Sequence, residues 1–363
     1  MIGVRFKILE PMMFRSLGEF SPEARGPYTF ARSSPLPTPS TIIGAIASLL
    51  YEKSKTVPKS KDWFKELEEL VGLRQECQVI GPYLLTRTGE KESVFVWCHD
   101  GLINIKDLYD KDFINYLSNI IEHHKSLETL DQLKSFTEIS RKINKYIDKC
   151  KRMPRTLSKL GVALNDRKTI IERLLYSIEM VDYMKLDEDA GDIFIAVDII
   201  GDLDQDLLSL SGTITRLGGE GRIVKVTVEE NISPLVIEDI RSKAESVRDF
   251  ALYLISPALF RTFKTDLEIN EISNQFRTYP NILKVIKQKI QDLTGFEVVT
   301  IIGKACVKSA GYKIDLDIKK PIYVSLEPGS IILVSNVDLK IRSISEIAQK
   351  IGYGSVLPIP LKT

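Results

Sequence analysis

The order of predicted strands and helices, nearly the same in the two halves of the chain, most restricts its possible folds. In the second half, strands are predicted at residues 250–255, 296–304, 322–334 and 356–361. Helices are predicted there at residues 279–293 and 344–351. Residues 322–334 are expected to form a hairpin that turns at residues 327–330, where proline and glycine follow one another.

The first half begins with the same kind of alternation. Strands are predicted at residues 4–9, 193–199 and 211–228, a helix at residues 42–50, and a hairpin at residues 81–97. A strand–helix–strand–strand–helix–strand order is typical of the ferredoxin-like arrangement. We therefore expect an α+β protein with two ferredoxin-like, RRM-like domains, at residues 1–240 and 241–363. A polar segment with apolar residues at helical spacing, about 107–150, predicts a helical insertion in the first domain.

Composition excludes several classes of protein. The 363 residues carry a net charge of +1, so any nucleic-acid site must come from local clustering of charge. Four cysteines lack a Cys-x-x-Cys pair and only three histidines are present, so neither a metal site nor another cofactor is expected. A signal peptide and an apolar run long enough to span a membrane are both absent from the sequence. We expect a cytoplasmic, reduced protein without a membrane partner.

Residues 213–222 form a glycine-dense segment that could hold an anion. Arg216 and Arg222 flank the glycines Gly218, Gly219 and Gly221. Glycine lets a ligand approach the main chain, and successive N–H groups with guanidiniums suit phosphate. No Lys-Ser or Lys-Thr follows and no helix opens after the glycines, so the nucleotide-binding fingerprints fail. A glycine-rich hairpin turn without a ligand is an equally good interpretation.

The long loop over residues 11–39 offers a second set of residues that could contact a nucleic acid. Its arginines are Arg15, Arg25 and Arg32, and its aromatic residues include Phe14, Tyr28 and Phe30. Aromatic faces can stack unpaired bases, although core packing is the commoner role of such residues. Residues 39–41 open the helix that follows, and Ser40 is expected to be its N-cap, so that free N–H groups there could also meet an anion.

Residues 141–173 are strongly basic. They hold eleven lysines and arginines against three acidic residues, a local charge of 11 − 3 = +8. Lys151, Arg152 and Arg155 lie at the centre of this run. The imbalance favours a polyanionic partner, and a merely solvated surface is the alternative.

Several short motifs, in order, resemble one known family. They lie at residues 11–20, 39–50, 81–85, 161–176, 217–222, 254–260, 328–330 and 352–355. Together they resemble the RAMP superfamily, and within it the third-numbered subunit of the Cmr complex, the type III-B CRISPR effector. The resemblance covers nearly the whole length. The chain departs from the family at residues 352–354, where its glycine loop is shorter than in many RAMP proteins.

The resemblance implies a role for the chain. Such subunits have two ferredoxin-like domains, hold the 5′ handle of the guide RNA, and contact the large polymerase-like subunit and backbone RAMP subunits. They are not known as the nuclease of the complex. The residues expected to bind RNA are Arg15, Arg25, Arg32, Ser40, Thr41, Lys151, Arg152, Arg155, Arg216, Gly218, Gly219, Gly221 and Arg222.

Two other functions stay open. Some RAMP relatives process precursor guide RNA, and metal-free cleavage would use histidine as acid and base. His99 follows a strand, and His123 with His124 lies on the helical insertion, where adjacent residues point about 100° apart. We therefore expect no catalytic residues. A purely structural subunit is the other alternative, and salt-dependent RNA binding separates it from an RNA-binding subunit.

Overall fold

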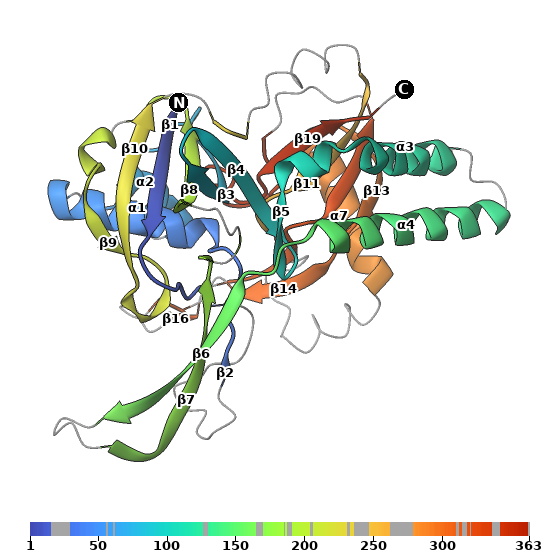
Figure 1. Cartoon of the computed structure of the whole chain (residues 1–363). Coiled ribbons are helices and arrows are strands. Elements are labelled where there is room, and N and C mark those ends of the chain that lie inside the picture. Colours follow the sequence, from blue (N-terminus) through green and yellow to red (C-terminus); the bar gives the residue numbers. More distant parts are fainter. Residues whose placement is uncertain are drawn as a thin grey trace.

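The structure, a computed structural model, describes the whole chain except residues 16–29, 56, 61, 126–129, 165–169, 185, 187–190, 204–205, 231–232, 236–246, 262–278, 310–311, 314–317, 320, 336–341 and 362–363. It is an α+β protein with two main sheets (Figure 1). All pairings within these two sheets are antiparallel. The predicted fold class is confirmed at this level.

The first sheet has seven strands in the order β5-β4-β3-β8-β1-β10-β9. Their bounds are β1 (Ile2–Ile8), β3 (Gln78–Thr88), β4 (Lys91–Cys98), β5 (Gly101–Asn104), β8 (Asp192–Ile200), β9 (Ile214–Arg216) and β10 (Ile223–Glu230). Alternate side chains of β1, Val4, Phe6 and Ile8, face one side of the sheet, as the sequence alternation requires. Helices α1 (Pro39–Ser54) and α2 (Trp63–Val71) pack in the same core.

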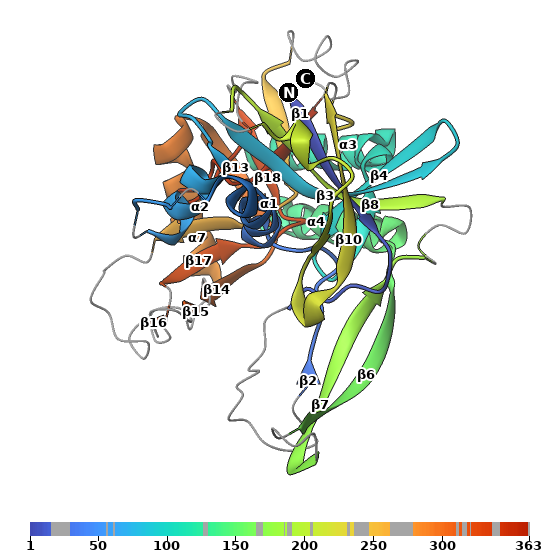
Figure 2. The same cartoon turned by 90° about the vertical axis from the view of Figure 1, so that its left-hand side faces the viewer.

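A long two-stranded ribbon projects from this domain (Figures 1 and 2). It consists of β6 (Arg155–Leu164) and β7 (Ile170–Asp182), with the short β2 (Phe30–Ala31) parallel to β7. Met12 and Val181 exchange both main-chain hydrogen bonds at its base, at 2.9 and 2.6 Å. The loop after β1 therefore anchors the ribbon to the domain.

The second half holds a four-stranded sheet, a three-stranded sheet and a helix. The first sheet contains β13 (Glu297–Ile302), β18 (Ile331–Ser335), β11 (Asp249–Leu254) and β19 (Val356–Pro360). The second contains β12 (Ala258–Arg261), β17 (Ile322–Leu326) and β14 (Ala305–Ser309). The helix is α7 (Tyr279–Thr294), and β15 (Tyr312–Lys313) pairs with β16 (Ile318–Lys319).

The two main sheets share one strand order. The neighbours β10-β1-β8-β3 in the first and β19-β11-β18-β13 in the second both run fourth, first, third, second, when each set is counted along the chain. In each half a helix, α1 or α7, follows the first of these strands. The last strand, β19, carries its prolines at a sheet edge, where a missing N–H is tolerated.

Two predictions for the second half are wrong. Residues 344–351 form turns instead of a helix, because Ser345 bonds to the main chain of Leu259 and Ala348 adopts a φ of 59°. Residues 322–334 do not form a hairpin. β17 pairs with β12 and β14, whereas β18 pairs with β11 and β13, so the turn at Glu327–Ser330 passes between two sheets.

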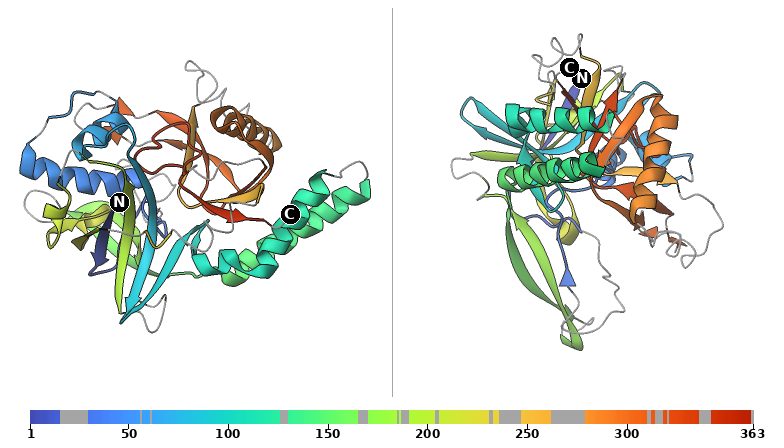
Figure 3. Two further views of the ribbon diagram at one scale, coloured as in Figure 1. Left: turned by 90° about the horizontal axis from the view of Figure 1, so that it is seen from above. Right: turned by 90° about the vertical axis from the view of Figure 1, so that its right-hand side faces the viewer.

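The two halves pack together through a shared apolar core. Buried residues of β3 and β4 meet those of β11, β18 and β19, and the helices α3 (Lys111–Lys125) and α4 (Leu130–Cys150) complete this cluster. These helices occupy the predicted insertion and lie on the outside of the molecule (Figure 3). The expected domain boundary at residue 240 lies outside the described residues.

Candidate nucleic-acid interface

A cavity of about 400 Å³ lies between α1, the loop after β1 and the glycine-rich turn. Five of the predicted site residues line it: Arg15, Thr41, Arg216, Gly218 and Gly219. Arg15 and Arg216 are exposed, and they lie 216 − 15 = 201 positions apart in the chain. The structure therefore brings the two sequence candidates, the long loop and the glycine turn, to one place.

Helix α1 supplies one wall of the cavity. Thr38, Thr41, Ala45 and Ser48 recur at helical spacing and face the cavity. No acidic residue lies in the first turn, so the positive end of the helix dipole is not neutralised locally. These features make this wall suitable for an anion or a polar group of a nucleotide.

The predicted cap of this helix is wrong by two residues. Thr38 occupies the N-cap position, because Pro39 is favoured as the first helical residue, and Thr38 makes no side-chain capping bond. The Ser40 hydroxyl instead lies 2.9 Å from the Tyr353 hydroxyl and 3.1 Å from that of Thr38. Ser40 therefore joins α1 to the end of the chain and does not line the cavity.

The glycine-rich segment is the turn between β9 and β10. Gly218 has a φ of 78°, and a Cβ there would collide with the carbonyl oxygen of Met13. The N–H of Gly219 donates to the same oxygen at 2.9 Å. The close approach that Gly218 permits is therefore made by the protein's own loop, and this contact shapes one side of the cavity.

The two arginines of this turn have different surroundings. Arg222 pairs with Glu10 at 2.7 Å, and the other oxygen of Glu10 accepts from the N–H of Ile223 at 2.8 Å. These two bonds lower the pKa of Glu10, the main-chain bond most. Arg222 thus fastens the turn to the loop after β1, whereas Arg216 is exposed at the cavity.

The remaining predicted residues lie elsewhere. Arg32 is exposed just after β2, Arg152 is exposed between α4 and β6, and Arg155 is exposed at the first position of β6. Lys151 is paired with Asp100 at 2.9 Å and with Asp148 at 3.4 Å. Gly221 is exposed in the turn, and Arg25 lies outside the described residues.

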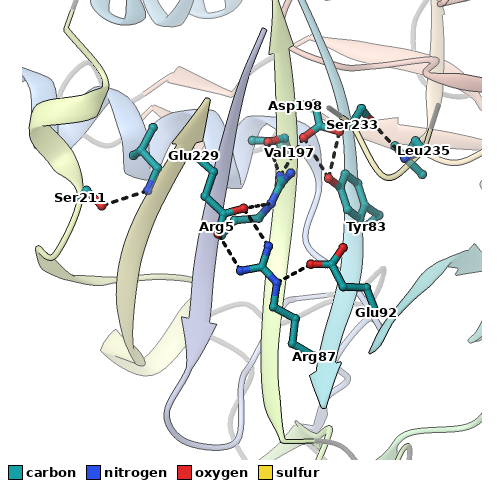
Figure 4. A network of polar contacts seen from close by, with 11 residues as sticks. Arg5, Tyr83, Arg87, Glu92, Val197, Asp198, Ser211, Glu229, Ser233 and Leu235 are labelled. Carbon is teal, nitrogen blue, oxygen red and sulfur yellow. Dashed lines mark hydrogen bonds and ion pairs between the residues drawn. The ribbon is translucent and has the colours of Figure 1, made fainter. Parts of the chain in front are cut away.

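The face of the first sheet opposite α1 is not available to bases near its centre. In RRM domains this kind of face stacks RNA bases on aromatic side chains. Here Arg5 and Asp198 form an ion pair at 2.8 Å with exposed fractions of 2% and 1% (Figure 4). Tyr83 donates to Asp198 at 2.9 Å, and burial followed by the Asp198 charge raises the pKa of Tyr83. Ser233 also bonds to Asp198, so the face is covered at this point.

The helical wall of the cavity was not predicted from the sequence. Gly44 and Ser48 lie one and two turns beyond Thr41, at positions of a helix whose other faces are filled with isoleucine and leucine. A Cβ at Gly44 would meet no atom within 4 Å. The signal in the sequence was a stripe of small residues at helical spacing, which could have predicted an unfilled face of the helix: Thr38, Thr41, Gly44, Ala45 and Ser48. Phe14, a candidate for stacking, lines the cavity but is 3% exposed and belongs to the core.

Groups that could catalyse or bind metal are dispersed in the described residues. Within them, no three His, Cys, Asp or Glu side chains are arranged as a metal site. His99 lies between β4 and β5, where its main-chain N–H donates to the main-chain oxygen of Pro328 at 3.2 Å. His123 and His124 belong to α3. None of the three lines the cavity. In the same residues, no helix is both long and apolar enough to cross a membrane.

Comparison with known proteins identifies the class as a CRISPR-associated protein. The model of the family described as "CRISPR-associated protein (Cas_Cmr3)" matches residues 6–107 and 121–360. The chain belongs to this family, and the membership expected from the sequence motifs is confirmed. A relative from Saccharolobus solfataricus, the CRISPR system CMR subunit Cmr3, is 30% identical over 253 residues, which are 65% of this chain and 70% of that protein.

Two solved structures have a similar fold. A chain of the type III-B Cmr-beta bound to cognate target RNA is 23% identical, with a TM-score of 0.54, over 91% of this chain and 86% of the other. A chain of the same assembly bound to cognate target RNA and AMPPnP is 21% identical, with a TM-score of 0.55, over 97% and 94% of the two chains. These likenesses concern the fold.

Proposed function

We propose that this chain is a non-catalytic RNA-binding subunit of a type III-B CRISPR effector, acting in the cytoplasm. It holds the 5′ handle of the guide RNA and contacts the large polymerase-like subunit and backbone RAMP subunits. Membership of the Cas_Cmr3 family supports the assembly, and the named relative is itself a CMR subunit. The repeated strand order supports two ferredoxin-like domains, with the second helix of each replaced by turns or a short 3-10 segment.

The cavity between α1 and the glycine turn is the observation that carries the RNA-binding part. It combines Arg15 and Arg216 with the N-terminus of α1, whose first turn holds no acidic residue, and with an open stretch of the helical wall at Gly44. A nucleotide of a single strand offers a phosphate for the two guanidiniums and a flat base for the open wall at Gly44. Arg222 is already paired with Glu10, and the sheet face opposite α1 is covered at Arg5 and Asp198. Within the described residues, the cavity is where exposed guanidiniums meet the N-terminus of α1.

Crosslinking tests this proposal. An assembled effector with a photoreactive nucleotide in the handle of its guide should give crosslinked peptides that contain Arg15, residues 38–48 or Arg216. A Gly44→Leu variant should lose most of this signal, because its side chain enters the cavity from a position where the added Cβ meets no other atom within 4 Å. Ser54→Leu, at the far end of α1, is the control, because it adds the same side chain to the same helix away from the cavity. Crosslinks confined to other segments in all variants would refute the site.

A further inference from the structure

The helix α4 and the start of β6 carry a second, separate concentration of positive charge. Residues 141–159 hold eight lysines and arginines against one aspartate, so their net charge is 8 − 1 = +7. The whole chain has a net charge of +1, which leaves 1 − 7 = −6 for all other residues. None of these residues lines the cavity described above.

The helix displays its charges on one side. Ile139, Ile143 and Ile147 are buried in the core between the two halves. At about 100° per residue, Arg141 and Lys145 then lie on the opposite side of α4. Lys142 and Lys149 flank them, and all four side chains are exposed. The basic face therefore follows from the same periodicity that builds the core.

The exposed charge continues beyond the end of the helix. Arg152, Arg155 and Lys159 are exposed along the connection and the first half of β6. Arg155 and Lys159 are four residues apart on a strand, so their side chains leave the same face of the ribbon. Figure 1 shows the connection that leads from the end of α4 into β6 and the ribbon. We call the set Arg141, Lys142, Lys145, Lys149, Arg152, Arg155 and Lys159 the basic stripe.

Internal ion pairs account for little of this charge. Among the described residues, Lys142 pairs with Glu138 at 3.4 Å, one helical turn away, in an exposed pair of small energetic value. Lys151 is different, because Asp100 and Asp148 hold it and only 18% of its side chain is exposed. Lys151 is therefore excluded from the basic stripe although it lies at its centre in sequence.

The dimensions of the stripe suit a nucleic-acid backbone. Residues 141–149 extend about 12 Å along a helix, and residues 155–159 add about 13 Å along a strand. This length spans several phosphates, since each strand of a duplex carries one phosphate per roughly 3.4 Å of helix axis. Tyr146, the aromatic residue within residues 141–159, stacks on Phe113 with ring centroids 5.1 Å apart, so the stripe is suited to contact with phosphates rather than to stacking of bases.

From this arrangement we infer that the basic stripe binds the phosphate backbone of a single-stranded RNA, independently of base sequence, as a second RNA surface apart from the cavity. It rests on the proposed function only for the class of ligand. A strand held here would follow α4 and pass onto the ribbon. The inferred ligand of the basic stripe is RNA, and an acidic protein surface is the competing ligand.

Salt-dependent binding of the full chain to an oligouridine, long enough to span the stripe, tests this inference. In the stripe variant, Arg141, Lys145 and Lys149 are replaced by glutamine, which keeps helix propensity and removes charge. The slope of log affinity against log salt should flatten by about 2 units, since each phosphate contact with a single strand contributes about 0.7. A matched variant with the exposed Lys65, Lys91 and Lys284 replaced by glutamine should keep the original slope.

Two further measurements make the test specific. Lys151→Gln should leave the slope unchanged, because that lysine is already neutralised. Gly44→Leu should reduce handle crosslinking and leave the oligouridine slope intact, so failure of the cavity and failure of the stripe are distinguishable. Equal flattening in the stripe and matched variants would overturn the inference. An unchanged slope would do the same, as would competition by polyglutamate as strong as that by RNA, which would assign the stripe to an acidic protein.

Discussion

The hydroxyl of Tyr353 lies 2.9 Å from that of Ser40 and joins the turn before the last strand to the first turn of α1. The ring of Tyr353 also meets Phe64 of α2 edge-on, with centroids 5.6 Å apart. The C-terminal glycine loop, residues 352–354, is therefore part of the contact between the two halves. Gly352 has a φ of 100°, and at this residue the loop passes close to the main chain of β3.

This contact predicts a graded loss of stability at position 353. Tyr353→Phe removes one hydrogen bond and should lower the free energy of unfolding by about 1 kcal/mol. Tyr353→Ala should lower it by about 3–5 kcal/mol, because it leaves a cavity between α1 and α2. Chemical denaturation measures both. Equal effects of the two changes would show that the ring does not pack as described.

Gly218 and Gly44 form a pair of substitutions with opposite expected signs. Gly218→Ala should destabilise the protein by about 1–3 kcal/mol, because φ is 78° and the added Cβ meets the main chain of Met13. Gly44→Ala should stabilise it by about 0.5–1 kcal/mol, since the site is helical and open. Thermal unfolding of both variants tests the pair, and a neutral Gly218→Ala would contradict the geometry of the turn.

The buried pair of Arg5 and Asp198 predicts a large effect of a single truncation. Asp198→Ala leaves a buried guanidinium and the Tyr83 hydroxyl without their carboxylate, so unfolding should become easier by about 3–5 kcal/mol. Glu92→Gln breaks a half-exposed pair with Arg87 and should cost less than about 1 kcal/mol. Denaturant titration of the two variants compares them directly. Similar small effects would mean that the centre of the sheet face is hydrated.

His99 predicts a pH dependence of stability. Burial, then the charges of Lys304 and Lys151, lowers the pKa of His99 from its usual value of 6.5. In the unfolded chain His99 takes up a proton first, so its contribution is complete above pH 6.5 and is lost as the pH falls through the lower, folded-state value. His99→Asn should flatten this dependence, and asparagine tolerates the φ of 54° at this position. An identical pH profile in the variant would contradict the assignment.

Absence of catalysis is a separate expectation. Replacing His123 and His124 together by alanine should leave guide-RNA maturation unchanged, because these side chains lie on α3 and not at the cavity. The measurement is the length distribution of guide RNA bound to the assembled variant. Loss of processing, with assembly intact, would identify the chain as a ribonuclease.

The sequence predicted the parts of the fold that depend on local pattern. Alternation located β1 and the hairpin of β3 and β4, and helical spacing located α3 and α4. The errors arose where long-range contacts decide. Residues 344–351 have helical composition, but bonds from Ser345 to Leu259 hold them in turns. Nothing local at Glu327–Ser330 shows that the strands on either side enter different sheets.

The candidate site followed the same division. Residue type alone marked Arg15 and the glycine turn, whereas their meeting in one cavity depends on the fold. Charge counting could not separate Arg216 from Arg222 or Lys151 from Arg152, because Glu10, Asp100 and Asp148 approach from other elements. Only tertiary structure shows which cations already have a partner.

The order of strands in the first sheet also sets the timing of folding during synthesis. β1 leaves the ribosome before the other strands of its sheet, but its two neighbours are β8 and β10, and Arg5 bonds to Val197, 192 residues later. At roughly 5–20 residues per second, β1 waits about 10–40 seconds for its partners. During that time its apolar side chains, Val4 and Phe6, have no sheet to enter. We expect the nascent β1 segment to be a binding site for chaperones, and a chain whose translation is arrested before β8 to remain protease-sensitive at β1.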